Sequence, residues 1–240
     1  METKKAMEFF ATENLLNLFT LTGLEIILGI DNVIFIALLV QHLEGAKRTR
    51  ARVFGLSLAF IARITMLFGA TWIMKLTAPL FSILSFPFSG RSLLLISGGL
   101  FLVVKSILEV MELFQGEEHT NYKKSKKQSY AQVIAQIIFI DIILSFDSII
   151  TAVGISDNLS IMVIAIVIAM IVMLVSAEPI GKCLSKNPSI KVLALAFIGF
   201  LGVILVLAGF NIEIDKGYLY FSLLFAGIVE TLNIKLRPKN

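Results

Sequence analysis

Cysteine, histidine and charge are all scarce in this chain. Its 240 residues include one cysteine, Cys183, and two histidines, and only 16% of them are charged. A lone cysteine excludes an internal disulfide, a paired-thiol redox centre and a thiolate metal cluster. The charged fraction also lies well below the roughly 25% of a typical soluble domain. Hydrophobic residues take the place of the missing charge and make up 57% of the chain.

These hydrophobic residues are gathered into seven runs, each close to the roughly 20 residues that a membrane-spanning helix needs. Too little chain lies between the runs for a soluble domain or for amphipathic helices that would cover a buried core. We therefore predict an all-α membrane protein, with seven transmembrane helices in a single transmembrane domain over residues 1–240. The runs cover about residues 15–40, 53–74, 93–113, 133–155, 159–177, 192–210 and 218–234, and Pro79, Pro87, Pro179 and Pro188 are expected at helix ends.

Basic residues are concentrated in alternate connections between the runs. The first, third and fifth connections and the C-terminus together hold fourteen Lys and Arg side chains, against five for the N-terminus and the other connections. Because basic loops stay in the cytoplasm, the N-terminus is expected outside and the C-terminus inside. This distribution also accounts for the net charge of +4, so no nucleic-acid partner is expected. The first run follows a mixed-charge stretch without a small-residue cleavage site, so no cleavable signal peptide is expected.

One acidic segment occurs twice. Glu25-Ile-Ile-Leu-Gly-Ile-Asp31-Asn32 matches Asp141-Ile-Ile-Leu-Ser-Phe-Asp147-Ser148 at an offset of 116 residues, and later matches, such as Gly99 with Gly199, have an offset of 100. Three helices per unit would make the second unit enter the membrane from the opposite side. We therefore predict a 3+3 inverted repeat plus one extra helix, which in transporters places the substrate near the bilayer midplane. Repeat 1 covers about 15–114, a cytoplasmic linker about 115–129, repeat 2 about 130–210, and the extra helix about 217–234.

Acids outnumber bases within the runs. The acids Glu25, Asp31, Glu109, Asp141, Asp147 and Glu230 face only two bases, Arg63 and Lys105. Each ionised acid at a helix centre costs roughly 2.5–3.5 kcal/mol, so cations, protons or water must compensate. One alternative is that the acids only form salt bridges with Arg63 and Lys105, which would lock the bundle; two bases, however, cannot partner all six acids.

The helix geometry suggests how these acids pair. Six residues rise about 9 Å and turn about 120° along a helix, so the two acids of one helix cannot share an ion unless that helix unwinds. Unwinding at Gly29 or Ser145 is left open. With the first helix running inward and the fourth outward, we expect Glu25 to meet Asp147 at one depth and Asp31 to meet Asp141 at another.

The predicted ligands are all hard oxygen donors. No histidine lies in a run, and His42 and His119 are expected to be solvated. Carboxylate, amide and hydroxyl oxygens suit Mn²⁺, Ca²⁺ or Mg²⁺ better than Zn²⁺ or Cu⁺, and protons would compete for the same carboxylates. Glu230 and Asn233 lie one turn apart on the last helix and would either extend the ion path or cap the bundle. The predicted metal residues are Glu25, Asp31, Asn32, Asp141, Asp147 and Ser148, with Arg63, Lys105, Thr151, Glu230 and Asn233 in supporting positions.

The two acidic segments resemble the signature segments of the TerC family of bacterial membrane proteins, named for tellurium resistance. Phe88-Ser-Gly-Arg91 and Lys216-Gly-Tyr-Leu-Tyr-Phe221 extend the resemblance over essentially the whole chain. It implies a multi-pass protein of the inner membrane, of the short form that lacks an appended soluble domain. It also implies a role in Mn²⁺ export or metal homeostasis, with Mn²⁺ or Ca²⁺ as the transported ion rather than a permanently bound cofactor. The lipid bilayer and the divalent ion are the expected partners, and homo-oligomerisation is left open.

The acidic segments are also compatible with two functions other than transport. An intramembrane aspartyl protease needs two facing carboxylates, but residues 28–31 read Leu-Gly-Ile-Asp rather than the Gly-x-Gly-Asp typical of those enzymes, so no enzyme is expected. The sequence leaves open a non-transporting membrane partner in metal or stress homeostasis.

Overall fold

Seven helices in the part of the chain that the structure describes are long and apolar enough to cross a membrane. The structure, a computed structural model, describes residues 12–83, 86–115, 129–156, 158–212 and 214–236. The protein is thus an all-α membrane protein, and the seven predicted spans are confirmed. They are Asn14–His42, Ala46–Phe68, Gly90–Phe114, Tyr130–Ile155, Leu159–Lys186, Pro188–Gly209 and Lys216–Leu236. Most of the expected linker at about 115–129, with His119, lies outside the described residues.

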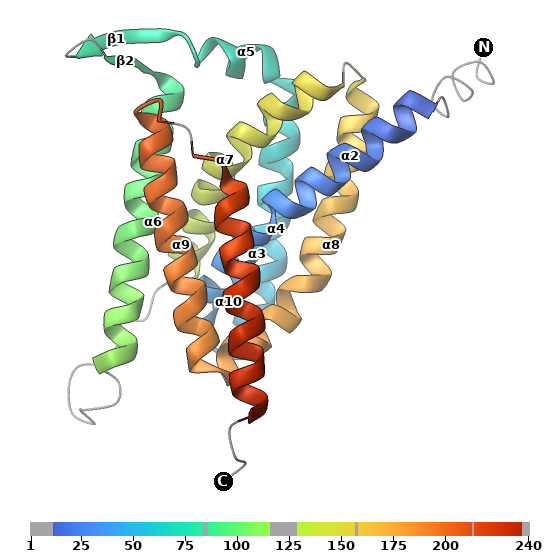
Figure 1. Cartoon of the computed structure of the whole chain (residues 1–240). Helices are drawn as coiled ribbons and strands as arrows, with labels where there is room; N and C mark the ends of the chain where they lie inside the picture. Colours follow the sequence, from blue (N-terminus) through green and yellow to red (C-terminus); the bar gives the residue numbers. More distant parts are fainter. Residues whose placement is uncertain (1–11, 84–85, 116–128, 157, 213, 237–240) are drawn as a thin grey trace. The chain divides into compact units, whose positions relative to one another are not determined.

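The first span is divided by a glycine. It consists of α2 (Thr12–Leu28), α3 (Ile30–Leu39) and the 3-10 turn η1 (Val40–His42), whereas the second span is α4 (Ala46–Phe68), which Gly69 separates from the short helix α5 (Ala70–Lys75). Each of the remaining spans is a single helix in Figure 1. They are α6 (Gly90–Gln115), α7 (Tyr130–Ile155), α8 (Leu159–Lys186), α9 (Pro188–Gly209) and α10 (Lys216–Leu236).

Local sequence signals set several helix ends. Ser129 caps α7: its hydroxyl accepts a hydrogen bond from the Gln132 N–H at 3.2 Å, and the Gln132 side chain accepts one from the Ser129 N–H at 2.9 Å. This reciprocal capping box satisfies two N–H groups that have no partner within the helix. At the end of α9, Asn211 adopts a left-handed conformation with φ 59°. This conformation lets the Ile212 N–H donate to the Leu207 carbonyl at 2.9 Å and closes the helix.

The structure differs from the expectations for proline. Pro79 and Pro87 lie in a short antiparallel hairpin of β1 (Pro79–Ile83) and β2 (Phe86–Ser89), which the sequence did not predict. Both strands of a two-stranded sheet are edge strands, where a missing N–H is tolerated. Pro179 lies inside α8 rather than at its end, whereas Pro188 opens α9 as expected.

The chain forms two compact units, each drawing on both halves of the sequence. The first comprises Met1–Lys75 and Gln128–Gly181, and the second Leu76–Lys127 and Lys182–Asn240. In the first unit, α4 packs along α7, and α3 also contacts α7. In the second, α6 and α9 lie side by side (Figure 1). A Cβ added at Gly99 would lie 2.5 Å from the Gly202 carbonyl oxygen, and one at Gly202 would lie 2.7 Å from that of Gly99. Glycine therefore allows these two backbones to touch.

Candidate functional site

Arg63 lies at the centre of a buried ion-pair cluster in the first unit. From α4 its Nη1 donates to Glu25 Oε2 of α2 at 2.6 Å, and its Nη2 donates to Asp141 Oδ1 of α7 at 3.0 Å. All three side chains are at most 4% exposed. The planar guanidinium can hold two carboxylates with separate N–H groups, which a lysine ammonium would do less specifically. One arginine thus connects three helices that are far apart in the sequence.

The two acidic segments differ in backbone structure. The first is interrupted at Gly29, whose N–H donates to the Ile26 carbonyl at 3.2 Å rather than to that of Glu25. Asp31 and Asn32 then stand in the first turn of α3, and both are buried. The second segment, in contrast, lies within α7, which is one helix from Tyr130 to Ile155. Of the two unwinding sites left open by the sequence, the helix is therefore interrupted only at Gly29.

Hydroxyl groups line the second acidic segment. The Ser145 hydroxyl donates to Asp141 Oδ2 at 3.3 Å, so each oxygen of this carboxylate accepts a hydrogen bond. The Ser148 hydroxyl donates to the Ser145 carbonyl at 3.1 Å, and the Thr151 hydroxyl donates to the Asp147 carbonyl at 2.8 Å. Ser148 is buried, whereas Thr151 is exposed. The lone pairs of the Ser148 oxygen stay available to a ligand because its proton is committed to the backbone.

Glu25 and Asp141 lie closer together than the expected pairing of acids by depth implies. These two acids were assigned to different depths, with Glu25 beside Asp147 and Asp141 beside Asp31, but both contact the guanidinium of Arg63. Depth taken from residue number assumes straight helices perpendicular to the membrane, whereas the first span is interrupted at Gly29 and neighbouring helices cross at an angle. The pairs Glu25–Asp147 and Asp31–Asp141 themselves stay predictions.

Negative charge exceeds positive charge in the buried part of the first unit. The other buried base, Arg52, donates to Glu178 of α8 at 2.8 Å. Among the residues that the structure describes, the buried carboxylates of this unit are Glu25, Asp31 and Asp141, against the two buried bases Arg52 and Arg63. If ionised, these five side chains carry a net charge of −1.

The other predicted supporting residues lie in the second unit. Lys105 Nζ is 2.9 Å from Glu109 Oε1, one turn further along α6, as the spacing of four residues allows. On α10, Glu230 is half-buried and Asn233 is exposed. Glu230 Oε1 is buried without a hydrogen-bond partner among the described residues. Neither the path-extending nor the capping role of Glu230 and Asn233 is decided by these positions.

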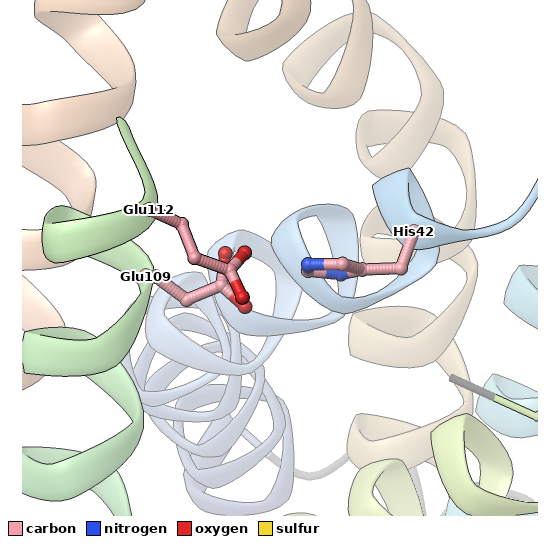
Figure 2. A group of neighbouring side chains, drawn as sticks. All are labelled: His42, Glu109 and Glu112. Carbon is pink, nitrogen blue, oxygen red and sulfur yellow. The ribbon is translucent and has the colours of Figure 1, made fainter. Parts of the chain in front are cut away.

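His42 and two glutamates are drawn in Figure 2. Glu109 and Glu112 extend from successive turns of α6 in the second unit, and His42 lies at the end of η1 in the first. The His42 ring nitrogen Nδ1 is 3.2 Å from the Leu39 carbonyl, and the side chain is half-buried rather than fully solvated as expected.

Two features of the first unit were missed in the sequence. Arg52 was counted as a loop residue, but α4 begins at Ala46 and places it two turns inside a helix, paired with Glu178. The sequence did contain one indication of this pair, because Glu178 is a further acid near the end of the fifth run. The contact of Met173 of α8 with Gly29 was also missed, because the two residues are far apart in the sequence.

The fold and this cluster define a class, a multi-pass membrane protein with an acidic, arginine-bridged cluster buried among its helices. The family model described as "Integral membrane protein TerC family" matches residues 10–238. The chain belongs to this family, as its acidic segments predicted.

Relatives from bacteria agree with this assignment. The chain is 46% identical over 222 residues to a UPF0053 protein of Haemophilus influenzae, covering 92% of this chain and 94% of the relative. It is 46% identical over 221 residues to the UPF0053 inner membrane protein YgdQ of Escherichia coli, covering 92% of each. The UPF0053 inner membrane protein YoaE of Escherichia coli is longer: the match is 41% identical and covers 95% of this chain but 44% of that protein. No solved structure matches the chain.

Proposed function

We propose that this protein is a divalent metal cation transporter of the bacterial inner membrane, with Mn²⁺ export as its most fitting activity. The main support is the buried cluster of the first unit, where Arg63 holds Glu25 and Asp141 and where Asp31 is also buried. Charged side chains inside a membrane protein are costly and usually mark an ion pathway. The inner-membrane location is inferred from relatives such as YgdQ.

In this proposal the cluster divides into a structural part and an ion-binding part. The guanidinium of Arg63 holds Glu25 and Asp141, so these acids set the positions of α2 and α7 around α4. Asp31, Asn32, Asp147 and Ser148 then supply carboxylate, amide and hydroxyl oxygens to the transported ion. Such ligands suit Mn²⁺, Ca²⁺ or Mg²⁺. The ion is cargo, and the proposal includes no permanently bound cofactor and no catalytic reaction.

The inverted repeat belongs to the same proposal and is supported by packing in the second unit. A Cβ at Gly99 would lie 2.8 Å from Val206 Cγ2, and one at Gly199 would lie 2.8 Å from Ser106 Oγ. Gly99 and Gly199 are 100 positions apart, and so are their contacts Ser106 and Val206. Each glycine therefore packs against the residue of the other helix that corresponds to the contact of its equivalent. Such reciprocal packing is expected where two related helices pack about a two-fold axis.

Uptake into proteoliposomes tests the proposal. The purified protein is expected to carry Mn²⁺, and the rates for Ca²⁺, Mg²⁺ and Zn²⁺ would define its preference. Asp31→Asn and Asp147→Asn are each expected to reduce the initial rate by at least about tenfold, because even indirect support of a metal ligand is worth 10–100-fold. Glu112→Gln, which alters an exposed acid of α6, is the matched control and is expected to leave the rate unchanged.

Two results would each contradict one part of the proposal. Unchanged flux in both aspartate variants would show that Asp31 and Asp147 do not bind the transported ion. If the wild type gave no metal-dependent flux, the alternative of a non-transporting membrane partner would be favoured. The aspartyl-protease alternative is weak because such enzymes need two carboxylates that share a proton, whereas Glu25 and Asp141 both bind Arg63.

Proton coupling is a further part of the proposal. Protons and metal ions compete for the same carboxylates, so an imposed pH gradient is expected to change the rate of Mn²⁺ uptake. The measurement uses the same proteoliposomes with and without the gradient and an ionophore that collapses it. Equal rates in the two conditions would rule out proton exchange while leaving metal transport intact.

A further inference from the structure

A thioether lies against the helix interruption in the first unit. A Cβ added at Gly29 would lie only 2.5 Å from Met173 Sδ and 3.3 Å from Met173 Cγ. Met173 is a residue of α8 and is 3% exposed. Its sulfur therefore occupies the space that any side chain at position 29 would need, directly beside the backbone between Glu25 and Asp31.

Polar groups at and after the helix interruption are incompletely used. The Glu25 carbonyl oxygen is 2.9 Å from the same added Cβ, and the Gly29 N–H bonds to Ile26 instead of to this oxygen. The Asn32 side chain is 2% exposed, yet neither its amide oxygen nor its amide nitrogen has a hydrogen-bond partner in the described part of the chain. A buried amide without partners is rare in folded proteins and calls for an explanation such as an absent ligand.

Helix geometry brings Asn32 toward the sulfur. Asn32 follows Gly29 by three residues, so the two positions lie on neighbouring turns of nearly the same face. Side chains on a helix lean toward its N-terminus, and the Asn32 amide is therefore expected over the turn that holds Gly29. Asp31, also buried in the first turn of α3, adds a carboxylate next to this amide.

A mixed oxygen and sulfur site selects among divalent ions. Thioether sulfur is a soft, uncharged ligand that transition metals accept, whereas Ca²⁺ and Mg²⁺ are hard ions that take oxygen ligands. We propose that Met173 Sδ, the Asn32 amide and the Asp31 carboxylate form one subsite at the interruption between α2 and α3, which selects transition-metal ions over Ca²⁺ and Mg²⁺. This inference rests on the proposed transport function and specifies its substrate class.

Methionine also fills irregular gaps in a core without binding anything, and the two roles give different results. A gap-filling Met173 would affect packing, and hence the transport of every ion, to a similar degree. A metal-binding Met173 would affect the discrimination between ions. The test therefore measures a ratio of ions rather than a rate alone.

Competition in proteoliposomes gives that ratio. The test variant is Met173→Leu, a volume-conserving change, and the control is Met170→Leu, which alters another buried methionine of α8. The Ca²⁺ concentration that halves Mn²⁺ uptake is expected to fall by about tenfold in Met173→Leu, the size of a lost supporting interaction at a metal, and to stay unchanged in Met170→Leu. An unchanged ratio in Met173→Leu would overturn the proposed subsite while transport itself stood.

A measurement on the wild-type protein covers the case in which Met173→Leu does not fold. X-ray absorption at the manganese edge of the Mn²⁺-loaded protein is expected to reveal a sulfur neighbour of the metal, and Met170→Leu should keep it. The lone cysteine, Cys183, is exposed near the end of α8, and Cys183→Ser should also leave this sulfur signal in place. A coordination shell of oxygen alone would overturn the inference. If the wild type neither binds nor carries Mn²⁺, the proposed function fails first.

Discussion

At the scale of single residues, Arg63 is the side chain that connects α4 to both α2 and α7 in the first unit. It is 2% exposed and its two terminal nitrogens serve acids on two different helices, while its Nε has no partner among the described residues. Burying such an ion pair costs free energy of desolvation. Removing only one of its partners costs far more, because the remaining charge is then buried without compensation. The buried charges of Arg63, Glu25 and Asp141 are therefore tolerated only when all three are present.

Replacement of Arg63 by methionine is expected to destabilise the protein by about 3–5 kcal/mol, because two buried carboxylates lose their only described basic partner. The measurement is thermal denaturation of the purified protein in detergent. Arg52→Met is the control, since the Glu178 partner of Arg52 is 48% exposed and can be solvated. Adding Glu25→Gln and Asp141→Asn to Arg63→Met should recover part of the loss. Equal stability of Arg63→Met and Arg52→Met would contradict this role.

At the scale of helices, the contact of α6 with α9 depends on glycine. The added Cβ at Gly99 meets the Gly202 carbonyl oxygen and the Val206 backbone nitrogen, at 2.5 and 2.8 Å. Both atoms belong to the backbone, so they can move only if the two helices separate. The same close approach underlies the small-residue contacts of other membrane helices.

Gly99→Ala is therefore expected to destabilise the protein by about 1–3 kcal/mol, the usual cost of overpacking. Gly227→Ala on α10 is the matched control, because an added Cβ there meets nothing within 4 Å. Alanine is also a better helix former than glycine by about 1 kcal/mol, so the control is expected to be neutral or stabilising. The two midpoints of thermal denaturation in detergent give the comparison. A Gly99→Ala midpoint at or above that of Gly227→Ala would show that the helices are not in backbone contact.

At the scale of the whole molecule, the orientation in the membrane stays a prediction. The prediction rests on the distribution of Lys and Arg between the connections. Four of the basic residues counted in the first connection lie in the first two turns of α4 rather than in a loop: Lys47, Arg48, Arg50 and Arg52. Arg48 also donates to the Leu43 and Gln41 carbonyls, at 3.1 Å in both cases. These side chains are still expected at the cytoplasmic end of the span, because the positive-inside rule extends to the ends of the helices.

Native Cys183 reports this orientation directly. It is exposed and lies near the end of α8 that is expected in the cytoplasm. A membrane-impermeant maleimide should label it in inside-out vesicles and not in intact spheroplasts. In a Cys183→Ser background, Asp215→Cys, in the connection before α10, should show the opposite pattern. Reversed labelling of the two positions would place the N-terminus in the cytoplasm.

The sequence by itself determined the seven spans and the positions of the acids. A run of about 20 apolar residues crosses a membrane whatever its neighbours are, and an acid within such a run is visible without a structure. The pairing of Lys105 with Glu109 was also predictable, because it depends only on a spacing of four residues in one helix. Such properties are local in the chain.

Tertiary structure decided the remainder. Two matching acidic segments take different backbone structures, interrupted at Gly29 and unbroken at Ser145, and at Gly29 the sulfur of Met173 fills the space beside the glycine. Arg63 lies 38 residues from Glu25 and 78 from Asp141 in sequence, so nothing local could reveal the bridge. The hairpin β1–β2 is local in the chain, and it was missed because a strand is stabilised by the partner strand with which it pairs. Contacts between helices and between strands depend on how these elements pack, which residue spacing alone does not encode.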